Sequence, residues 1–152
     1  MKLDPVDRSI LLILQEEGRI TNAELAERVH LSPSACLRRT KLLEESGLIA
    51  RTVALLDQRL AGLPGTAFVF VTLESQGRAA LDTFEAAVRN VPEITECYLL
   101  AGQNDYLLRI VYRETADLER MHTEVLTPLP GVLRVQSTLT LRAVKRTTTL
   151  PI

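Results

Sequence analysis

The 152-residue sequence predicts an α+β protein in which three N-terminal helices precede a ferredoxin-like βαββαβ sheet domain. Two observations support this fold class. Apolar residues recur at helical spacing up to residue 46, whereas strand-like and helix-like patterns alternate after residue 65. Glycine and proline interrupt the chain between residues 62 and 65. We therefore place one domain boundary here, giving a first domain of residues 1–60 and a second of residues 61–152.

Each of the three N-terminal helices has a recognisable start. The first opens with Asp4 as N-cap, followed by a proline in the first turn. The second opens with Thr21, which is spaced to form a capping box with Glu24. The third opens with Ser32, again followed by proline, and extends to about residue 46, where a glycine follows. The sequence therefore predicts three short helices within the first 46 residues.

The segments after the third helix are richer in β-branched residues. Residues 49–57 predict a strand that leads out of the first domain. In the second domain, helices are marked by Leu81, Phe84 and Val88 and by Leu118, Met121 and Val125. The expected strands there are residues 66–74, 94–101, 105–112 and 132–141. This order is βαββαβ, with both helices on one face of an antiparallel sheet.

The first strand of this sheet has two apolar faces. Phe68 and Phe70 point one way, while the alternate residues Val69, Val71 and Leu73 point the other. The two helices can cover only one of these faces. The other face needs a partner, most economically the same sheet of a second copy. We therefore expect a homodimer.

Composition excludes several classes of protein. The chain is 46% hydrophobic and 24% charged, which is typical of a globular domain. It has no run of about 18 apolar residues and no signal-peptide pattern at its start, so we expect a cytoplasmic protein. Cys36 and Cys97 lack the spacing of a disulfide framework or zinc site, and neither His30 nor His122 has a second ligand nearby. We expect no metal, no cofactor and no catalytic residue.

The net charge of −1 conceals a basic cluster between residues 28 and 51. A solvated helix face is the ordinary interpretation of such a cluster. Two short helices joined by a tight turn, the second one basic, also fit the major groove of double-stranded DNA. Cys36, Thr40 and Leu43 recur at helical spacing and should pack inward, whereas Thr21 and Asn22 are better explained as helix caps. The candidate DNA-binding residues are Ser34, Arg38, Arg39 and Lys41, and which of them contact bases stays open.

Residues 20–49, ITNAELAERVHLSPSACLRRTKLLEESGLI, resemble the helix-turn-helix of the leucine- and asparagine-responsive (Lrp/AsnC, feast/famine) regulators. The S-P-S-x-C-L-R-R core is the most specific part, and the resemblance continues through AGQNDYLLRIV, LPGV and VKRTTTLPI. It implies a winged-type helix-turn-helix domain joined by a strand to a ligand-sensing domain. It also implies dimers formed through the sheets and often assembled into octamers of four dimers. His30 occupies a turn position often held by glycine, and histidine tolerates a left-handed backbone.

A loop of Gly102, Gln103, Asn104 and Asp105 joins the two middle strands. From composition alone it is a hairpin turn. The resemblance implies instead that a free amino acid binds beside this G-x-x-D loop, between neighbouring dimers. Asp105 could accept from the ammonium group, and backbone N–H groups near Gly102 could donate to the carboxylate. The candidate effector-binding residues are Gly102, Asn104, Asp105, Gln136 and Thr138.

Gln136 and Thr138 come from the last strand, which has a polar and an apolar face. Arg134, Gln136, Thr138 and Thr140 share the polar face, while Leu133, Val135, Leu139 and Leu141 should pack under the helices. A purely structural use of Gln136 and Thr138 stays open. Where the family commonly has an acidic and an aromatic residue in the loop, this chain has Gln103 and Asn104, which leaves the effector undetermined.

Together these features predict a sequence-specific DNA-binding transcription regulator, not an enzyme, whose activity or assembly responds to a small effector, an amino acid. One alternative is a DNA-architectural protein that senses nothing. Another is a sirohaem decarboxylase, since some such enzymes share this architecture, but their pockets need histidines or arginines for propionate groups and this chain has two histidines. The effector, the target genes and the sign of regulation stay open.

Overall fold

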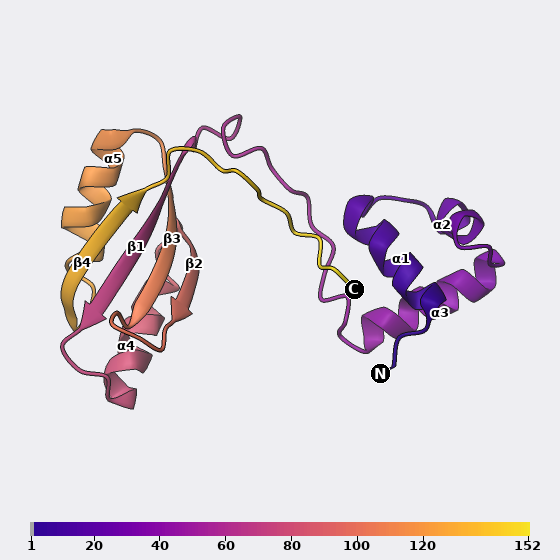
Figure 1. Cartoon of the computed structure of the whole chain (residues 1–152), viewed down its shortest axis with the longest axis horizontal. Coiled ribbons are helices and arrows are strands. Elements are labelled where there is room, and N and C mark those ends of the chain that lie inside the picture. The colour runs from indigo at the N-terminus through magenta and orange to yellow at the C-terminus, as the bar shows by residue number, and fades with distance from the viewer. Residues whose placement is uncertain (1) are drawn as a thin grey trace. The chain divides into compact units, whose positions relative to one another are not determined.

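The protein, described for residues 2–152 by a computed structural model, forms two compact units. Unit 1 contains the residues up to Leu55 together with Lys145–Ile152, and unit 2 is Leu56–Val144. The sequence places one boundary after residue 60, whereas the chain in fact crosses between the units twice (Figure 1). The second crossing arises because the C-terminal tail packs with unit 1. Within residues 2–152, no helix combines the length and apolarity needed to cross a membrane.

Unit 1 is built on three helices, α1 (Pro5–Glu16), α2 (Asn22–Arg28) and α3 (Pro33–Glu45). The predicted starts are confirmed: the N-caps are Asp4, Thr21 and Ser32, and each side chain accepts a backbone N–H of the first turn. The glycine after α3, Gly47, has a φ of 78°, a left-handed conformation that ends the helix. The core of this unit is made of side chains from all three helices: Ile10, Leu11, Leu25, Ala26, Cys36 and Leu43.

The predicted strand over residues 49–57 does not form. Residues 51–57 have no regular secondary structure, although their β-branched and apolar content is typical of a strand. A segment of this composition forms a β-strand only when a neighbouring strand completes its backbone hydrogen bonds. No strand of the described chain lies beside this segment, and Val53, Leu55 and Leu56 are left exposed.

The C-terminal tail is attached to α1 through one glutamine. The Gln15 Nε2 donates to the Leu150 carbonyl at 3.3 Å, and the Leu150 N–H donates to Gln15 Oε1 at 2.6 Å. Leu150 and Ile152 line an apolar groove of about 680 Å³, together with α1, α3 and the segment after α3. The tail therefore adds apolar surface to a domain whose helices alone leave this groove open.

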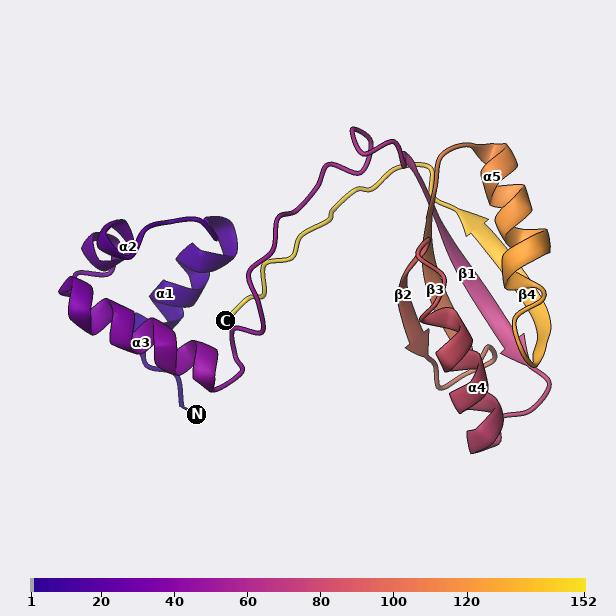
Figure 2. The same ribbon diagram turned by 180° about the vertical axis from the view of Figure 1, so that it is seen from behind.

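Unit 2 has the predicted βαββαβ order. Its elements are β1 (Gly65–Leu73), α4 (Arg78–Val88), β2 (Ile94–Leu99), β3 (Tyr106–Tyr112), α5 (Thr115–Arg120) with its continuation η1 (Met121–Leu126), and β4 (Val132–Leu139). The strands pair antiparallel in the order β2-β3-β1-β4. Figures 1 and 2 show both helices on one face of the sheet, which leaves the other face open.

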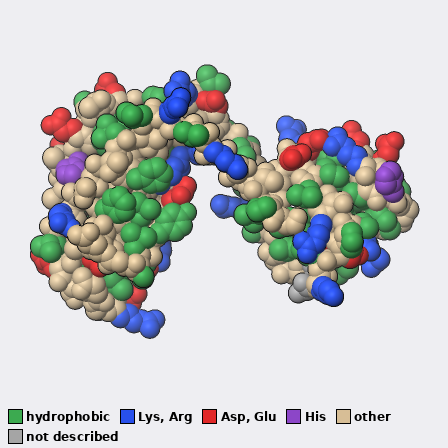
Figure 3. All heavy atoms as spheres, in the orientation of Figure 1, with side chains coloured by type: hydrophobic (Ala, Val, Ile, Leu, Met, Phe, Trp, Pro, Cys, Tyr) green, Lys and Arg blue, Asp and Glu red, His purple; other side chains and the backbone are tan. Residues whose placement is uncertain are grey.

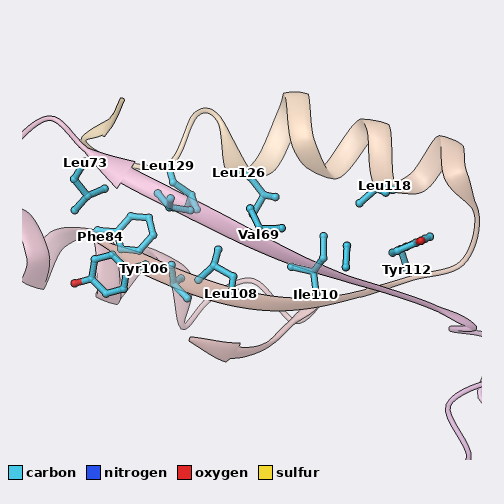
Figure 4. Close-up of a cluster of buried hydrophobic side chains, with 13 residues drawn as sticks. Val69, Leu73, Phe84, Tyr106, Leu108, Ile110, Tyr112, Leu118, Leu126 and Leu129 are labelled. Atoms are coloured by element: carbon cyan, nitrogen blue, oxygen red, sulfur yellow. The ribbon is translucent and has the colours of Figure 1, made fainter. Parts of the chain in front are cut away.

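The core of unit 2 lies between the helices and the covered face of the sheet (Figure 4). Val69, Val71 and Leu73 of β1 are buried there, as the alternation predicts. The Phe84 ring of α4 lies 4.6 Å from the Tyr106 ring of β3, centroid to centroid. Burial and the hydrogen bond to Glu85 raise the pKa of Tyr106 far above its ordinary value.

The predicted second helix of this unit is one continuous segment with a change of pitch. After α5, the residues Met121–Leu126 form a π-helical turn, with the Thr127 N–H bonded to the His122 carbonyl. In a π-helix hydrogen bonds join residues five apart, so residues at that spacing come to one side. Met121 and Leu126 are five apart and both fully buried. The wider turn therefore keeps the apolar side of this segment on the sheet.

The apolar face of β4 is only partly covered, contrary to expectation. Val135 packs against the core, but Leu133, Leu139 and Leu141 are at least half exposed. β4 is an edge strand, and its pairing with β1 is irregular where Val132 lies opposite Leu73. The alternation is therefore right for Val135 and wrong for Leu133, because at this irregularity Val132 takes the place on the covered face, and Leu139 and Leu141 lie at and beyond the end of the strand.

Candidate nucleic-acid interface and effector loop

Helix α3 has a buried side and an exposed side, and the predicted DNA-binding residues divide between them. Cys36 and Leu43 are buried against α1 and α2. At about 100° per residue, Ser34, Arg38 and Lys41 lie within about 60° of one another, roughly opposite that buried side. All three are exposed, and no ion pair is formed by Arg38 or Lys41 with any residue of 2–152. This surface of α3 can therefore meet an anionic partner.

The start of α3 is fixed by the turn before it. His30 has a φ of 54°, the left-handed conformation that the sequence predicts for this position. Asn22 is the first residue of α2, and its Nδ2 donates to the Pro33 carbonyl at 2.9 Å. The Ser32 side chain accepts the Ala35 N–H and lies 3.2 Å from the Ser34 hydroxyl. Asn22 thus joins α2 to the first turn of α3, a role that sequence reasoning missed.

Two arginines of the basic cluster are occupied within unit 1. The Arg28 guanidinium binds Glu17, with Nη2 to Oε2 at 3.0 Å, and this partner raises the pKa of Arg28. Arg39 lies about 100° around α3 from Arg38. Its Nη1 donates to Asp4 and Asp7 at the start of α1, at 2.7 Å each. The structure therefore separates Arg39 from the other predicted DNA-binding residues.

The predicted effector loop lies at the end of β1. The Asp105 carboxylate accepts the Leu73 N–H at 2.7 Å and, more weakly, the Gln76 side chain at 3.4 Å. The Thr72 hydroxyl donates to Asn104 Oδ1 at 3.4 Å. Gly102 is exposed, and a Cβ there would meet no atom within 4 Å. Asp105 thus holds the β1–α4 connection, a structural task that the G-x-x-D pattern did not indicate.

The two remaining effector candidates lie at different distances from this loop. Arg134 pairs with Thr72, Gln136 with Phe70 and Thr138 with Phe68. At about 3.4 Å per residue, Gln136 lies roughly 7 Å along the sheet from the Thr72 position, and Thr138 roughly 14 Å. Both point to the open face, away from the helices, as predicted. One free amino acid cannot reach from the loop to Thr138 within a single chain.

The open face of the sheet carries exposed apolar side chains around one buried arginine. Phe68 and Tyr98 are exposed at 37% and 52%, and hydrophobic side chains gather over the strands in Figure 3. The side chain of Arg109 is only 11% exposed; its Nη1 donates to Thr95 and its Nη2 to Gln58. Sequence reasoning missed both Arg109 and Gln58, since an arginine in a strand carries no signal of its burial.

The histidines and cysteines form no metal site or disulfide among residues 2–152. Cys36 is fully buried in unit 1. Cys97 lies against the core of unit 2, and burial raises the pKa of its thiol. The His122 Nδ1 lies 2.9 Å from the Ser137 hydroxyl, which joins the π-helical turn to β4.

Both units match known families. Residues 3–50 match the winged helix-turn-helix DNA-binding family, and residues 66–150 match the Lrp/AsnC ligand binding domain family. Among curated relatives, the chain is 34% identical to the transcriptional regulator AzlB of Bacillus subtilis, covering 99% of this chain and 96% of that protein. It is 41% identical to the leucine-responsive regulatory protein of Rhizobium meliloti, covering 95% of this chain and 93% of that protein.

Solved structures give the same result. A transcriptional regulator from Neisseria meningitidis, crystallised as a complex with L-methionine, is 41% identical and superposes with a TM-score of 0.94 over 99% of this chain and 97% of that one. An AsnC family regulator from Agrobacterium tumefaciens is 36% identical, with a TM-score of 0.93 over 98% of this chain and 97% of that one. Fold and sequence therefore agree over nearly the whole length.

Proposed function

Because this chain belongs to the Lrp/AsnC family of transcriptional regulators, we propose that it controls transcription by binding DNA through α3 and a free amino acid through unit 2. The observation that carries this proposal is the match of both units, each to the family with the corresponding task. The relatives described above are named as regulators. The L-methionine complex of the Neisseria relative supports an amino acid as the effector class.

The proposed DNA contacts are Ser34, Arg38 and Lys41. Their side chains lie on the exposed side of α3, away from Cys36 and Leu43. A guanidinium such as that of Arg38 can donate two parallel hydrogen bonds to a guanine or a phosphate. Ser34 lies in the first turn of the helix, where backbone N–H groups also favour phosphate. These three residues form the reading surface of the protein.

The proposed effector site is the loop of Gly102, Asn104 and Asp105 with Gln136 beside it. One oxygen of Asp105 already binds the Leu73 N–H, which leaves the second oxygen for the ammonium group of an amino acid. Thr138 lies too far along the sheet to share that ligand within one chain. Its participation requires a loop from another subunit, so a site that includes Thr138 is complete only in an assembly.

The proposed assembly is a homodimer through the open face of the sheet, with octamers of four dimers beyond it. Phe68 and Tyr98 remain exposed on this face, and apolar side chains at this density favour a protein partner. A second copy presents the same strands and therefore offers a complementary surface. A regulator that acts on chromosomal DNA works in the cytoplasm of a bacterial cell, and we place this protein there.

The test is a two-part binding experiment on the full chain. Genomic fragments that the protein retains are sequenced with and without each of the twenty amino acids, and calorimetric titration measures amino-acid binding directly. We expect specific fragments to be enriched and at least one amino acid to bind and change the enrichment. Enrichment without binding of any amino acid would favour a DNA-architectural protein. Absence of enrichment would refute the proposal.

A further inference from the structure

Arg39 and two carboxylates form an ion-pair cluster between α1 and α3. Asp4 and Asp7 also cap α1: Asp4 Oδ1 accepts the Asp7 N–H at 2.8 Å, and Asp7 Oδ2 accepts the Asp4 N–H at 3.3 Å. Their other two oxygens, Asp4 Oδ2 and Asp7 Oδ1, accept from Arg39 Nη1. All four carboxylate oxygens therefore have a partner within unit 1.

The cluster is well placed for stability. Two carboxylates at the N-terminus of α1 interact favourably with its helix dipole. Asp7 and Arg39 are largely shielded from solvent, with side chains 15% and 28% exposed. The backbone N–H of Asp7 and then Arg39 hold the pKa of Asp4 below its ordinary value, and the two carboxylates raise that of Arg39. A phosphate that recruited Arg39 would have to compete with two carboxylates already bound to its Nη1.

The position of Arg39 around α3 also favours a contact within the protein over a contact with DNA. Arg39 lies about 40–60° from the buried residues Cys36 and Leu43, but about 100° from Arg38. It is therefore closer to the side of α3 that packs against the other helices. The reading surface is on the opposite side of the helix, and an ion cluster at this point opposes rotation of α3 about its own axis.

We propose that Arg39 is a positioning residue, which through Asp4 and Asp7 sets the rotation of α3 and so aims Ser34, Arg38 and Lys41 at DNA. This inference rests on the proposed DNA-binding function of α3. It assigns the two neighbouring arginines opposite tasks: Arg38 meets the anionic partner, while Arg39 meets the protein. It also makes the start of α1 part of the DNA-binding machinery without any contact to DNA.

The test compares Arg39→Ala, the double variant Asp4→Asn with Asp7→Asn, and Arg38→Ala as a reference. Asparagine still caps a helix, so the double variant removes charge and keeps the cap. The probe is a labelled duplex that the wild-type chain has enriched from a random-sequence pool. Its affinity is measured by fluorescence anisotropy from about 50 to 200 mM salt, a range over which each phosphate contact adds about 0.9 to the salt slope.

For Arg38→Ala we expect the salt slope to fall by about 0.9, if its contact is to phosphate, or sequence preference to relax, if its contact is to a base. For Arg39→Ala we expect an affinity loss of roughly three- to tenfold at unchanged slope. The double Asn variant should weaken binding similarly, also at unchanged slope. The triple variant that combines Asp4→Asn, Asp7→Asn and Arg39→Ala should bind the duplex no more weakly than Arg39→Ala alone. The Asn pair and the Ala substitution remove the same ion pairs, so their effects should not add.

If Arg39 contacted a phosphate instead, the salt slope of Arg39→Ala and the affinity of the double Asn variant would both differ from these expectations. Arg39→Ala would then lower the slope by about 0.9, and the double Asn variant would bind more tightly, because it removes two negative charges and frees the guanidinium. Either result overturns the positioning role, and the double variant decides the question even where Arg39→Ala fails to fold. Absence of salt-dependent binding by the wild-type chain would instead refute the proposed function itself.

Discussion

Replacing Asp105 separates its structural task from its proposed task in effector binding. The Leu73 N–H that Asp105 accepts at 2.7 Å belongs to a residue only 1% exposed. In Asp105→Ala that donor loses its partner, and a buried unpaired N–H costs about 1–3 kcal/mol. In Asp105→Asn the amide oxygen can still accept, so the loss should stay below about 1 kcal/mol. The weak, exposed Gln76 contact adds nothing to either figure.

Thermal unfolding followed by circular dichroism measures the structural part. For a domain of this size, each kcal/mol lowers the midpoint by about 4–8 °C, so the transition of unit 2 should fall clearly in Asp105→Ala and little in Asp105→Asn. The essential result is that unit 2 unfolds at a lower temperature in Asp105→Ala than in Asp105→Asn. An alanine variant as stable as the wild type would refute the role of Asp105 in holding Leu73.

Amino-acid titration of the same two proteins measures the ligand part. Binding of a ligand ammonium depends on the negative charge, which Asn lacks. We therefore expect Asp105→Asn to lose amino-acid affinity by more than about tenfold while its stability is nearly kept. Duplex affinity without an amino acid should be unchanged in this variant. An Asn variant that binds the amino acid as tightly as the wild type would remove Asp105 from the proposed site.

Three further predictions concern packing, the tail and pH. A Cβ at Gly65 would lie 2.2 Å from the Tyr112 ring, so Gly65→Ala should destabilise unit 2 by about 1–3 kcal/mol; a denaturant midpoint equal to the wild type would show that Tyr112 moves aside freely. Gln15→Ala removes both hydrogen bonds to Leu150, and we expect faster amide exchange in residues 147–152. The control Glu16→Ala, at the adjacent exposed position, should leave that exchange unchanged. Equal exchange in the two variants would contradict the attachment of the tail by Gln15. The pKa of Asp4 is lowered in the folded chain, so the stability that its carboxylate contributes is present above the ordinary pKa of 3.8 and is lost as the pH falls below that value. Acid unfolding of Asp4→Asn should therefore depend less on pH in this range than that of the wild type. Identical unfolding curves would refute this account.

The sequence was sufficient where a short-range rule decides the structure. The caps at Asp4, Thr21 and Ser32 depend on residues within one helical turn, and all three are confirmed. Alternation along residues 66–74 predicts the buried side of β1 because a strand has a fixed period of two. The strand predicted over residues 49–57 fails for the opposite reason. A strand needs a neighbour, and no pattern within the segment reveals whether one is present.

The candidate sites show the same division between local and distant information. Exposure of Ser34, Arg38 and Lys41 follows from helical spacing alone. Occupation of Arg39 by Asp4 and Asp7 does not, because these partners are more than thirty residues away in the chain. A charge count treats Arg38 and Arg39 alike. The spacing of Asp4 and Asp7, both at the start of α1, is the one signal that could have suggested a basic partner.

The C-terminal tail gives unit 1 two covalent connections to the rest of the chain, at Leu55 and at Lys145. The tail is held by two hydrogen bonds to one glutamine, and the side chains of Leu150 and Ile152 line the apolar groove. Release of the tail would therefore leave the three helices of unit 1 with a single covalent connection to the rest of the chain, at Leu55.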